Sequence, residues 1–336
     1  MPIQNVGDMS QHFQTLRQVS ETKSSLNRLS NELATQKKSD ITASLGGATG
    51  QLDTLNREIN RLNVYSGVTQ QVAQRLSFMQ STLAGVESLR DSAMNQFLGI
   101  TQDSRVDTVQ DAAEMGEATF KDFTAAFNKR LGEFALFSGT ATDRAPLANA
   151  DDMLTDIRSA IGGLNTSEDI IAAVDTWFTD PAGGFATMGY LGDTGSNLDQ
   201  KIGTNGSVTI NARADNDEVI ELLKSAALAA LADEQVPGLT QDTRAELVAS
   251  SGALLLSAGD GLTDMRARLG ASEAQVSEAS TTLATQITAF SIDRNALTTA
   301  DPFETATRLQ DVQQQLEMQY SVTARLSQLS LVNFLR

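Results

Sequence analysis

The sequence predicts a mainly α-helical protein in which long N- and C-terminal segments form an antiparallel coiled-coil bundle around a small mixed α/β insert. All five prolines lie outside residues 3–145 and 238–301, so long uninterrupted helices can form in both stretches. Nine of the 24 glycines fall between Gly162 and Gly206, which marks a turn-rich middle. On both sides of that middle, apolar residues recur at alternating steps of three and four, as in a coiled-coil seam.

These patterns divide the chain into a bundle, an insert and two terminal helices. Residues 46–140 and 236–300 are predicted to form the helical bundle core. Residues 141–235 are predicted to form the insert domain, with a helix and a β-hairpin. Residues 1–45 and 301–336 are predicted to be N- and C-terminal assembly helices, each separated from the bundle by helix-breaking residues.

Two seams predict how the bundle closes. The first consists of Leu52, Leu55, Ile59, Leu62, Ser66, Thr69, Ala73 and Leu76, and the second of Leu262, Met265, Leu269, Ser272, Val276, Ala279, Leu283, Gln286 and Phe290. Helices with so thin an apolar stripe are not stable alone. We therefore expect these two seams to pack against each other within one chain.

The insert shows shorter elements. Residues 167–178 have Ile170 and Val174 on one helical face, and residues 217–232 form a second helical pattern. Asn205-Gly206 is a two-residue hairpin turn signal, and alternating apolar residues follow it. The sequence therefore predicts two helices and one β-hairpin in this region.

The two ends of the chain carry seams of their own, rich in intervening Gln and Ser. Asp301-Pro302 opens the last helix as a cap followed by a first-turn proline. A chain that needed only a monomeric fold would have little reason to keep both ends as unpaired amphipathic helices. The residues predicted to form the assembly interface are Phe13, Leu16, Leu26, Leu29, Leu33, Leu309, Val312, Leu316, Leu326 and Leu329.

Composition argues against several classes of function. The formal net charge of −17 disfavours binding to nucleic acid and to anionic membranes. The chain has no cysteine and one histidine, His12, so thiol chemistry and His- or Cys-rich metal sites are not expected. Neither a Walker loop nor a G-x-G-x-x-G motif occurs. We therefore predict a non-enzymatic protein with no catalytic residues, no cofactor and no bound metal.

The N-terminus lacks the basic and apolar pattern of a cleaved signal peptide, and no apolar run is long enough to span a bilayer. If the protein leaves the cell, we expect a route that needs no cleaved signal.

Three stretches resemble the family of flagellins and hook–filament junction proteins. The C-terminus, from Asp301-Pro302-Phe303 to Phe334-Leu335, is similar to the Leu-, Gln- and Ser-rich closing helix of both groups. Residues 136–147 and residues 190–203 resemble the junction type. Residues 36–44 lack the polar stretch with paired aspartates that is usual in flagellins, which favours the junction type further.

The resemblance implies a structural subunit of the bacterial flagellum that joins hook to filament. Its ends would be disordered in the free monomer and would fold into coiled coils against neighbouring subunits. The implied partners are other copies of itself, an adjacent hook-associated protein, flagellin and an export chaperone. The implied location is the extracellular flagellum, reached by type III export. Two alternatives stay open, a flagellin that forms the filament itself and a secreted helical effector or adhesin.

Overall fold

The computed structural model describes residues 4–195, 197–204 and 206–334, with the side chains of residues 4–9, 11–12 and 326–334 left out of the description. The chain divides into two compact units, Met1–Leu62 with Thr285–Arg336, and Asn63–Ala284. The fold is mainly α-helical with short strands, as predicted.

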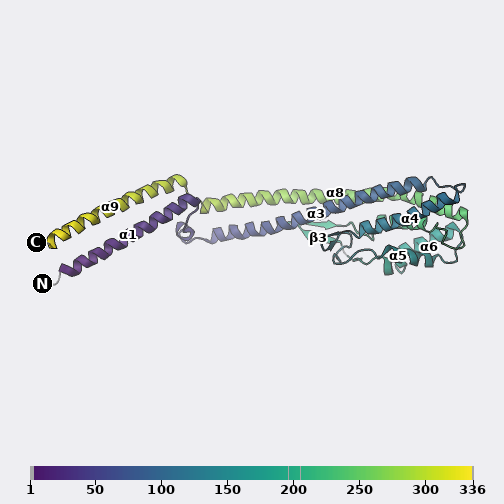
Figure 1. The fold of residues 1–336 in the computed structure, drawn as a ribbon, viewed down its shortest axis with the longest axis horizontal. Coiled ribbons are helices and arrows are strands. Elements are labelled where there is room, and N and C mark those ends of the chain that lie inside the picture. Colours follow the sequence, from purple (N-terminus) through teal and green to yellow (C-terminus); the bar gives the residue numbers. More distant parts are fainter. Residues whose placement is uncertain (1–3, 196, 205, 335–336) are drawn as a thin grey trace. The chain divides into compact units, whose positions relative to one another are not determined.

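The first unit pairs the two ends of the chain. Helix α1 (Gln4–Thr35) lies antiparallel beside α9 (Pro302–Phe334), as Figure 1 shows. The unit also contains α2 (Ile41–Ser44), the beginning of α3 (Gly50–Phe97) and the end of α8 (Gln241–Thr298). The expectation that the terminal helices have no partner within the chain is therefore wrong. The segments next to α1 and α9 lie side by side, so the two amphipathic helices can bury their apolar faces against each other without a second chain.

Where this helix pair begins, backbone hydrogen bonds join the segment that follows α1 to the segment between α8 and α9. The Lys38 amide donates to the Thr298 carbonyl at 2.9 Å, and the Ala300 amide donates to the Gln36 carbonyl at 3.1 Å. Asp301 caps α9, because its Oδ1 accepts hydrogen bonds from the amides of Phe303 and Glu304 at 2.8 and 3.1 Å. The helix start predicted at Asp301-Pro302 is confirmed.

The second unit holds most of the shorter elements. They are α4 (Val106–Phe127), β1 (Arg130–Leu131), β2 (Phe134–Ala135), α5 (Ala150–Ala160), α6 (Ser167–Thr179), the π-helical η1 (Phe185–Gly189), β3 (Leu198–Lys201), β4 (Ser207–Ile210) and α7 (Asp217–Ala230). Strand β3 pairs with β4 in antiparallel register, with Lys201 opposite Ser207. The two predicted helices and the predicted hairpin are confirmed, although Asn205 itself lies outside the described residues.

Within the second unit, α3 and α8 pack through the predicted seams. Leu76 on α3 and Leu262 and Leu269 on α8 are buried, and the Gln80 side chain donates to the Arg266 carbonyl at 2.9 Å. Two positions of the predicted seams differ from the prediction, because Ala73 on α3 and Gln286 near the end of α8 are exposed.

On α3, Ala73 is exposed and Val72 is buried instead. The half-buried Ser66 and the buried Thr69 and Val72 follow one another at two consecutive steps of three. A repeated step of three locally overwinds a coiled coil and rotates the seam.

Helix α4 packs closely on α7 and joins the predicted bundle to the predicted insert in one hydrophobic core. The closest approach is at Gly116, where an added Cβ would lie 2.5 Å from the Ala229 Cβ. Phe120 and Phe123 on α4 are fully buried beside this crossing. Because the residues at the crossing are small, the two helices approach closely and the neighbouring aromatic side chains pack without leaving a cavity.

Candidate assembly surface on the terminal helices

The interface between α1 and α9 is thin. Among the described side chains of the two helices, the buried ones are Thr22, Leu29 and Thr305, so Leu29 is the one large apolar residue fully enclosed there. The half-buried leucines and valine of the predicted seams lie around it: Leu26, Leu33, Leu309, Val312 and Leu316. A pair with so little enclosed apolar surface gains only modest stability from burial.

A polar layer lies in the middle of this pair. The Gln319 Nε2 donates to Thr22 Oγ1 at 3.1 Å, and Thr22 Oγ1 in turn donates to the Gln18 carbonyl at 2.8 Å. The Gln319 Oε1 is buried and has no hydrogen-bond partner in the described part of the chain. One residue further on each helix, the Lys23 ammonium lies 5.6 Å from the centre of the Tyr320 ring, within the range of a cation–π contact.

Large apolar side chains lie on the outside of the same two helices. Phe303 is 83% exposed, Met318 62% and Val322 54%. Phe13 and Leu16 on α1 are exposed as well. The described terminal helices therefore expose more large apolar side chains than they enclose. Exposed apolar side chains gathered on one element are typical of a surface that another chain covers.

The predicted interface residues thus separate into groups. Phe13 and Leu16 are exposed, whereas Leu29 is buried and the other described seam residues are half-buried within the single chain. The side chains of Leu326 and Leu329 lie outside the described residues. The predicted interface residues do not include the exposed Phe303, Met318, Tyr320 and Val322, because the prediction followed only the spacing of three and four. Their bulk in a helix rich in Gln and Ser was the signal that could have found them.

The two internal stretches that resemble junction proteins, residues 136–147 and 190–203, contact each other in the second unit. The Leu191 amide donates to the Pro146 carbonyl at 2.7 Å, and the Asp193 amide donates to the Ser138 carbonyl at 3.1 Å. The Thr140 hydroxyl also donates to the Asp193 carboxylate. The two stretches therefore form one connected local structure.

Local electrostatics follow from this arrangement. The hydrogen bond from Thr140, and then the one from the Gly195 amide, lower the pKa of the Asp193 carboxyl below its usual range. Burial is the main reason that the pKa of Tyr190 is raised, and its hydroxyl donates to the Asp193 carbonyl at 3.1 Å. Gly192 leaves room for that ring, because an added Cβ would lie 2.4 Å from the Tyr190 hydroxyl oxygen.

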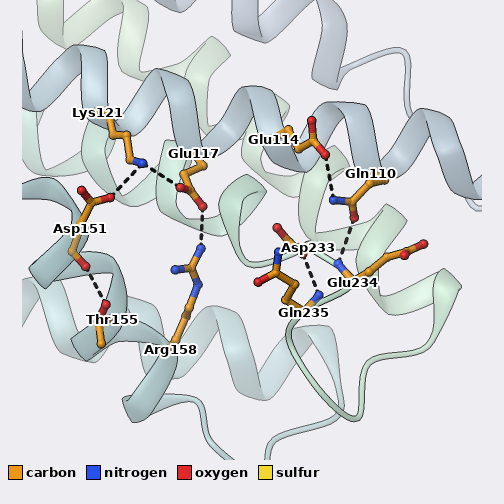
Figure 2. Close-up of polar contacts among 10 residues, drawn as sticks. All are labelled: Gln110, Glu114, Glu117, Lys121, Asp151, Thr155, Arg158, Asp233, Glu234 and Gln235. Atoms are coloured by element: carbon orange, nitrogen blue, oxygen red, sulfur yellow. Dashed lines mark hydrogen bonds and ion pairs between the residues drawn. The ribbon is translucent and has the colours of Figure 1, made fainter.

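A network of charged side chains joins α4 to α5 (Figure 2). The Lys121 ammonium lies 2.8 Å from carboxylate oxygens of both Glu117 and Asp151, and the Arg158 Nη2 lies 2.7 Å from the other Glu117 oxygen. The hydrogen bond from Lys121 is the largest cause of the lowered pKa of Glu117. Each carboxylate in this network faces a cation, so the network holds helices together and is not arranged for acid–base catalysis.

A second group in the same view ties α4 to the link between α7 and α8. The Glu234 amide donates to the Gln110 side-chain oxygen at 3.0 Å, and the Gln110 Nε2 donates to Glu114 at 3.2 Å (Figure 2). The Gln235 amide donates to Asp233 at 2.7 Å. These contacts fix the link against α4.

A metal site and a membrane span are both absent from the described residues. No group of three or more His, Cys, Asp and Glu side chains in the described parts of the chain is placed to hold a metal ion. Over the same parts, no helix combines the length and the apolar character that crossing a membrane would require.

The class of protein that emerges is a mainly helical protein whose polar networks join helices to one another. Residues 255–335 match the family model for the bacterial flagellin C-terminal helical region. This match covers α8 from residue 255 onward and the whole of α9. It supports a flagellin-like structural protein of the bacterial flagellum.

One similar solved structure is described, provisionally, as a flagellar hook-associated protein from Vibrio parahaemolyticus, with 14% sequence identity and a TM-score of 0.41. The similarity covers 74% of this chain and 94% of that one. No curated protein sequence matches the chain.

Proposed function

We propose that the protein is a non-enzymatic structural subunit of the bacterial flagellum that joins hook to filament and assembles through α1 and α9. The observation that carries the proposal is the distribution of apolar residues on these helices. Leu29 is enclosed between them, whereas Phe303, Met318 and Val322 are exposed. In an assembly, neighbouring copies would cover these exposed side chains and add the burial that the single pair lacks.

The junction role, as distinct from the filament, draws on the middle of the chain. Residues 136–147 and 190–203 resemble the junction type, and hydrogen bonds join them. A junction subunit needs two unlike faces, one toward the hook and one toward the filament. Its partners would be other copies of itself, an adjacent hook-associated protein and flagellin. An export chaperone and extracellular delivery by the flagellar type III route belong to the same proposal.

A filament-forming flagellin is the second candidate function. It is favoured by the match of residues 255–335 to the flagellin C-terminal helical region. A flagellin repeats one heterologous contact at every step and therefore grows without limit when seeded. The match does not favour the third candidate function, that of a secreted helical effector or adhesin.

Seeded growth distinguishes the first two candidates. The purified chain is concentrated with short filament fragments and viewed by electron microscopy. We expect short oligomers or no growth, and we expect cells that lack the gene to make hooks while shedding flagellin monomers into the medium. Long filaments built of this chain alone would contradict the junction role and establish the flagellin role.

A further inference from the structure

A cavity of about 440 Å³ lies beside α3 in the second unit. Residues of α3, of the β1–β2 hairpin and of β3 line it. Its lining contains one cation, Arg75, and one carboxylate, Glu133, and the other side chains are apolar or uncharged. Gln71 and Gln74, which line the cavity from α3, are exposed. The cavity is therefore accessible to a partner from outside the chain.

Arg75 is a half-buried cation without a charged partner in the described part of the chain. Its Nη2 donates to the Ala135 carbonyl at 2.7 Å, and its buried Nε has no hydrogen-bond partner there. Glu133 lines the same cavity but forms no ion pair with Arg75. Burial lowers the pKa of Arg75, because the guanidinium loses water and gains no anion in return. A carboxylate in the cavity would supply that anion through charge-assisted hydrogen bonds.

Two exposed phenylalanines lie next to Arg75. Phe134 lines the same cavity and is 50% exposed, and Phe78 is 52% exposed. Phe78 follows Arg75 by three residues and Gln74 by four on α3, so these side chains are neighbours on the helix surface. Arginine and aromatic side chains are enriched at the centres of interfaces between proteins. The combination therefore favours another protein over a small molecule as the occupant.

We propose that Arg75, Phe78 and Phe134 form a carboxylate socket, a surface that receives an acidic side chain from a second copy of the chain. Charge complementarity identifies the partner, because the chain carries 42 acidic and 25 basic residues and so offers many carboxylates to its neighbours. The inference rests on the proposed function, in which copies lie next to one another. It adds a contact on the second unit to the one on the terminal helices.

The socket also acts against the repulsion between copies. Each copy carries a formal net charge of −17, so like charges disfavour close contact between them. A carboxylate held by Arg75 is neutralised at the contact, while Phe78 and Phe134 bury apolar surface. Loss of the guanidinium would leave that carboxylate unpaired, which should weaken the contact by about 10-fold or more.

Photo-crosslinking on the full chain tests the socket. Benzoylphenylalanine replaces Gln71, an exposed residue of the cavity lining that lies one helical turn before Arg75. The purified chain is concentrated and irradiated, and a crosslink between two copies appears at twice the mass of the chain on a denaturing gel. We expect this double-mass product, with an acidic residue in the crosslinked segment that mass spectrometry identifies. Crosslinks within single chains alone would overturn the proposal.

Removal of the guanidinium distinguishes the socket from a chance contact. Arg75→Leu is compared with Arg105→Leu, which removes the same charge from an exposed arginine of the same unit. We expect Arg75→Leu to reduce the yield of double-mass product by about 10-fold and Arg105→Leu to leave it unchanged. Equal yields from the two variants would overturn the proposal.

Two further variants guard against a structural effect of Arg75→Leu, which also removes the hydrogen bond to Ala135. Phe78→Ser and Phe134→Ser leave that hydrogen bond in place, and we expect each to reduce the yield by about threefold or more. A decrease in Arg75→Leu alone would show that the change acts through the hairpin, and it would overturn the proposal.

Irradiation of purified flagella identifies the partner in the assembly. On flagella that retain the benzoylphenylalanine variant, we expect the same double-mass product, and a crosslink to another protein alone would overturn the choice of a second copy. Failure of the wild-type chain to be retained on flagella would contradict the proposed function. The socket is then judged by the yield from the concentrated purified chain alone.

Discussion

The close crossing of α4 and α7 gives the sharpest prediction about stability. In Gly116→Ala, the new Cβ would lie 2.5 Å from the Ala229 Cβ and 2.6 Å from the Ala230 amide nitrogen. Carbon atoms in contact are ordinarily about 3.5–4.0 Å apart, so the two helices must separate by about 1 Å. The obstruction is helix backbone, which cannot rotate away as a flexible side chain could.

The expected magnitude combines two opposing effects. Overpacking of a well-packed core costs about 1–3 kcal/mol. Alanine in place of glycine within a helix stabilises by about 1 kcal/mol, which offsets part of that cost. We therefore expect Gly116→Ala to lower the free energy of unfolding of the second unit by up to about 2 kcal/mol.

Gly85→Ala is the matched control for this change. Gly85 lies within α3 in the same unit, and an added Cβ there meets no atom within 4 Å. Without an obstruction, the helix propensity of alanine should raise the free energy of unfolding by about 0.5–1 kcal/mol. The two variants should therefore move in opposite directions.

Urea unfolding followed by the fluorescence of Trp177, the single tryptophan, measures both variants in the unit that contains them. With a slope of about 2–3 kcal/mol per molar urea, Gly116→Ala should lower the midpoint by about 0.5 M and Gly85→Ala should raise it slightly. A midpoint for Gly116→Ala at or above that of the wild type would refute the reasoning about the crossing. An equal decrease in both variants would do so as well.

Two other predictions concern polar contacts of the second unit. The indole nitrogen of the buried Trp177 donates to the Asp156 carboxylate at 2.7 Å. Asp156→Ala should leave this nitrogen unpaired and lower the free energy of unfolding by about 1–3 kcal/mol. An unchanged urea midpoint would show that the contact contributes nothing to stability. The hydrogen bond from Lys121 lowers the pKa of Glu117 in the folded protein, so its contribution is present at neutral pH and is lost as the pH falls through that lowered pKa. Wild type should therefore lose more stability than Glu117→Gln between about pH 6 and pH 3 in thermal unfolding, and parallel losses would contradict this role.

Elements with strong local signals were predictable from the sequence. The seams of α3 and α8, the helices at 167–179 and 217–230 and the hairpin of β3 and β4 all follow from periodicity or turn residues. The exposure of Ala73 was not predictable in this way, because a shift of the seam by one residue depends on how two long helices wind around each other.

The pairing of α1 with α9 depends on tertiary contacts and could not be predicted from the sequence. The sequence shows that α1 and α9 are amphipathic, but it does not show that Gln36 and Lys38 hydrogen-bond to Ala300 and Thr298, which lie just before the start of α9. That closure at the base places α1 against α9. The Thr22–Gln319 hydrogen bond joins residues 297 positions apart, and neither residue stands out in its own helix.

Assembly through the outer surface of α1 and α9 can be measured directly on flagella. Cells that lack their own copy of the gene would express Leu16→Glu with Val322→Glu, which places two carboxylates at exposed apolar positions of the terminal helices. The control, Val64→Glu with Leu256→Glu, adds the same charge at exposed apolar positions of the second unit. The measured quantity is the fraction of exported protein that is retained on purified flagella. We expect the control to be retained like the wild type and the terminal variant to be recovered mainly in the medium, because carboxylates are unfavourable in a buried contact between copies. Retention of the terminal variant at the wild-type fraction would contradict assembly through this surface.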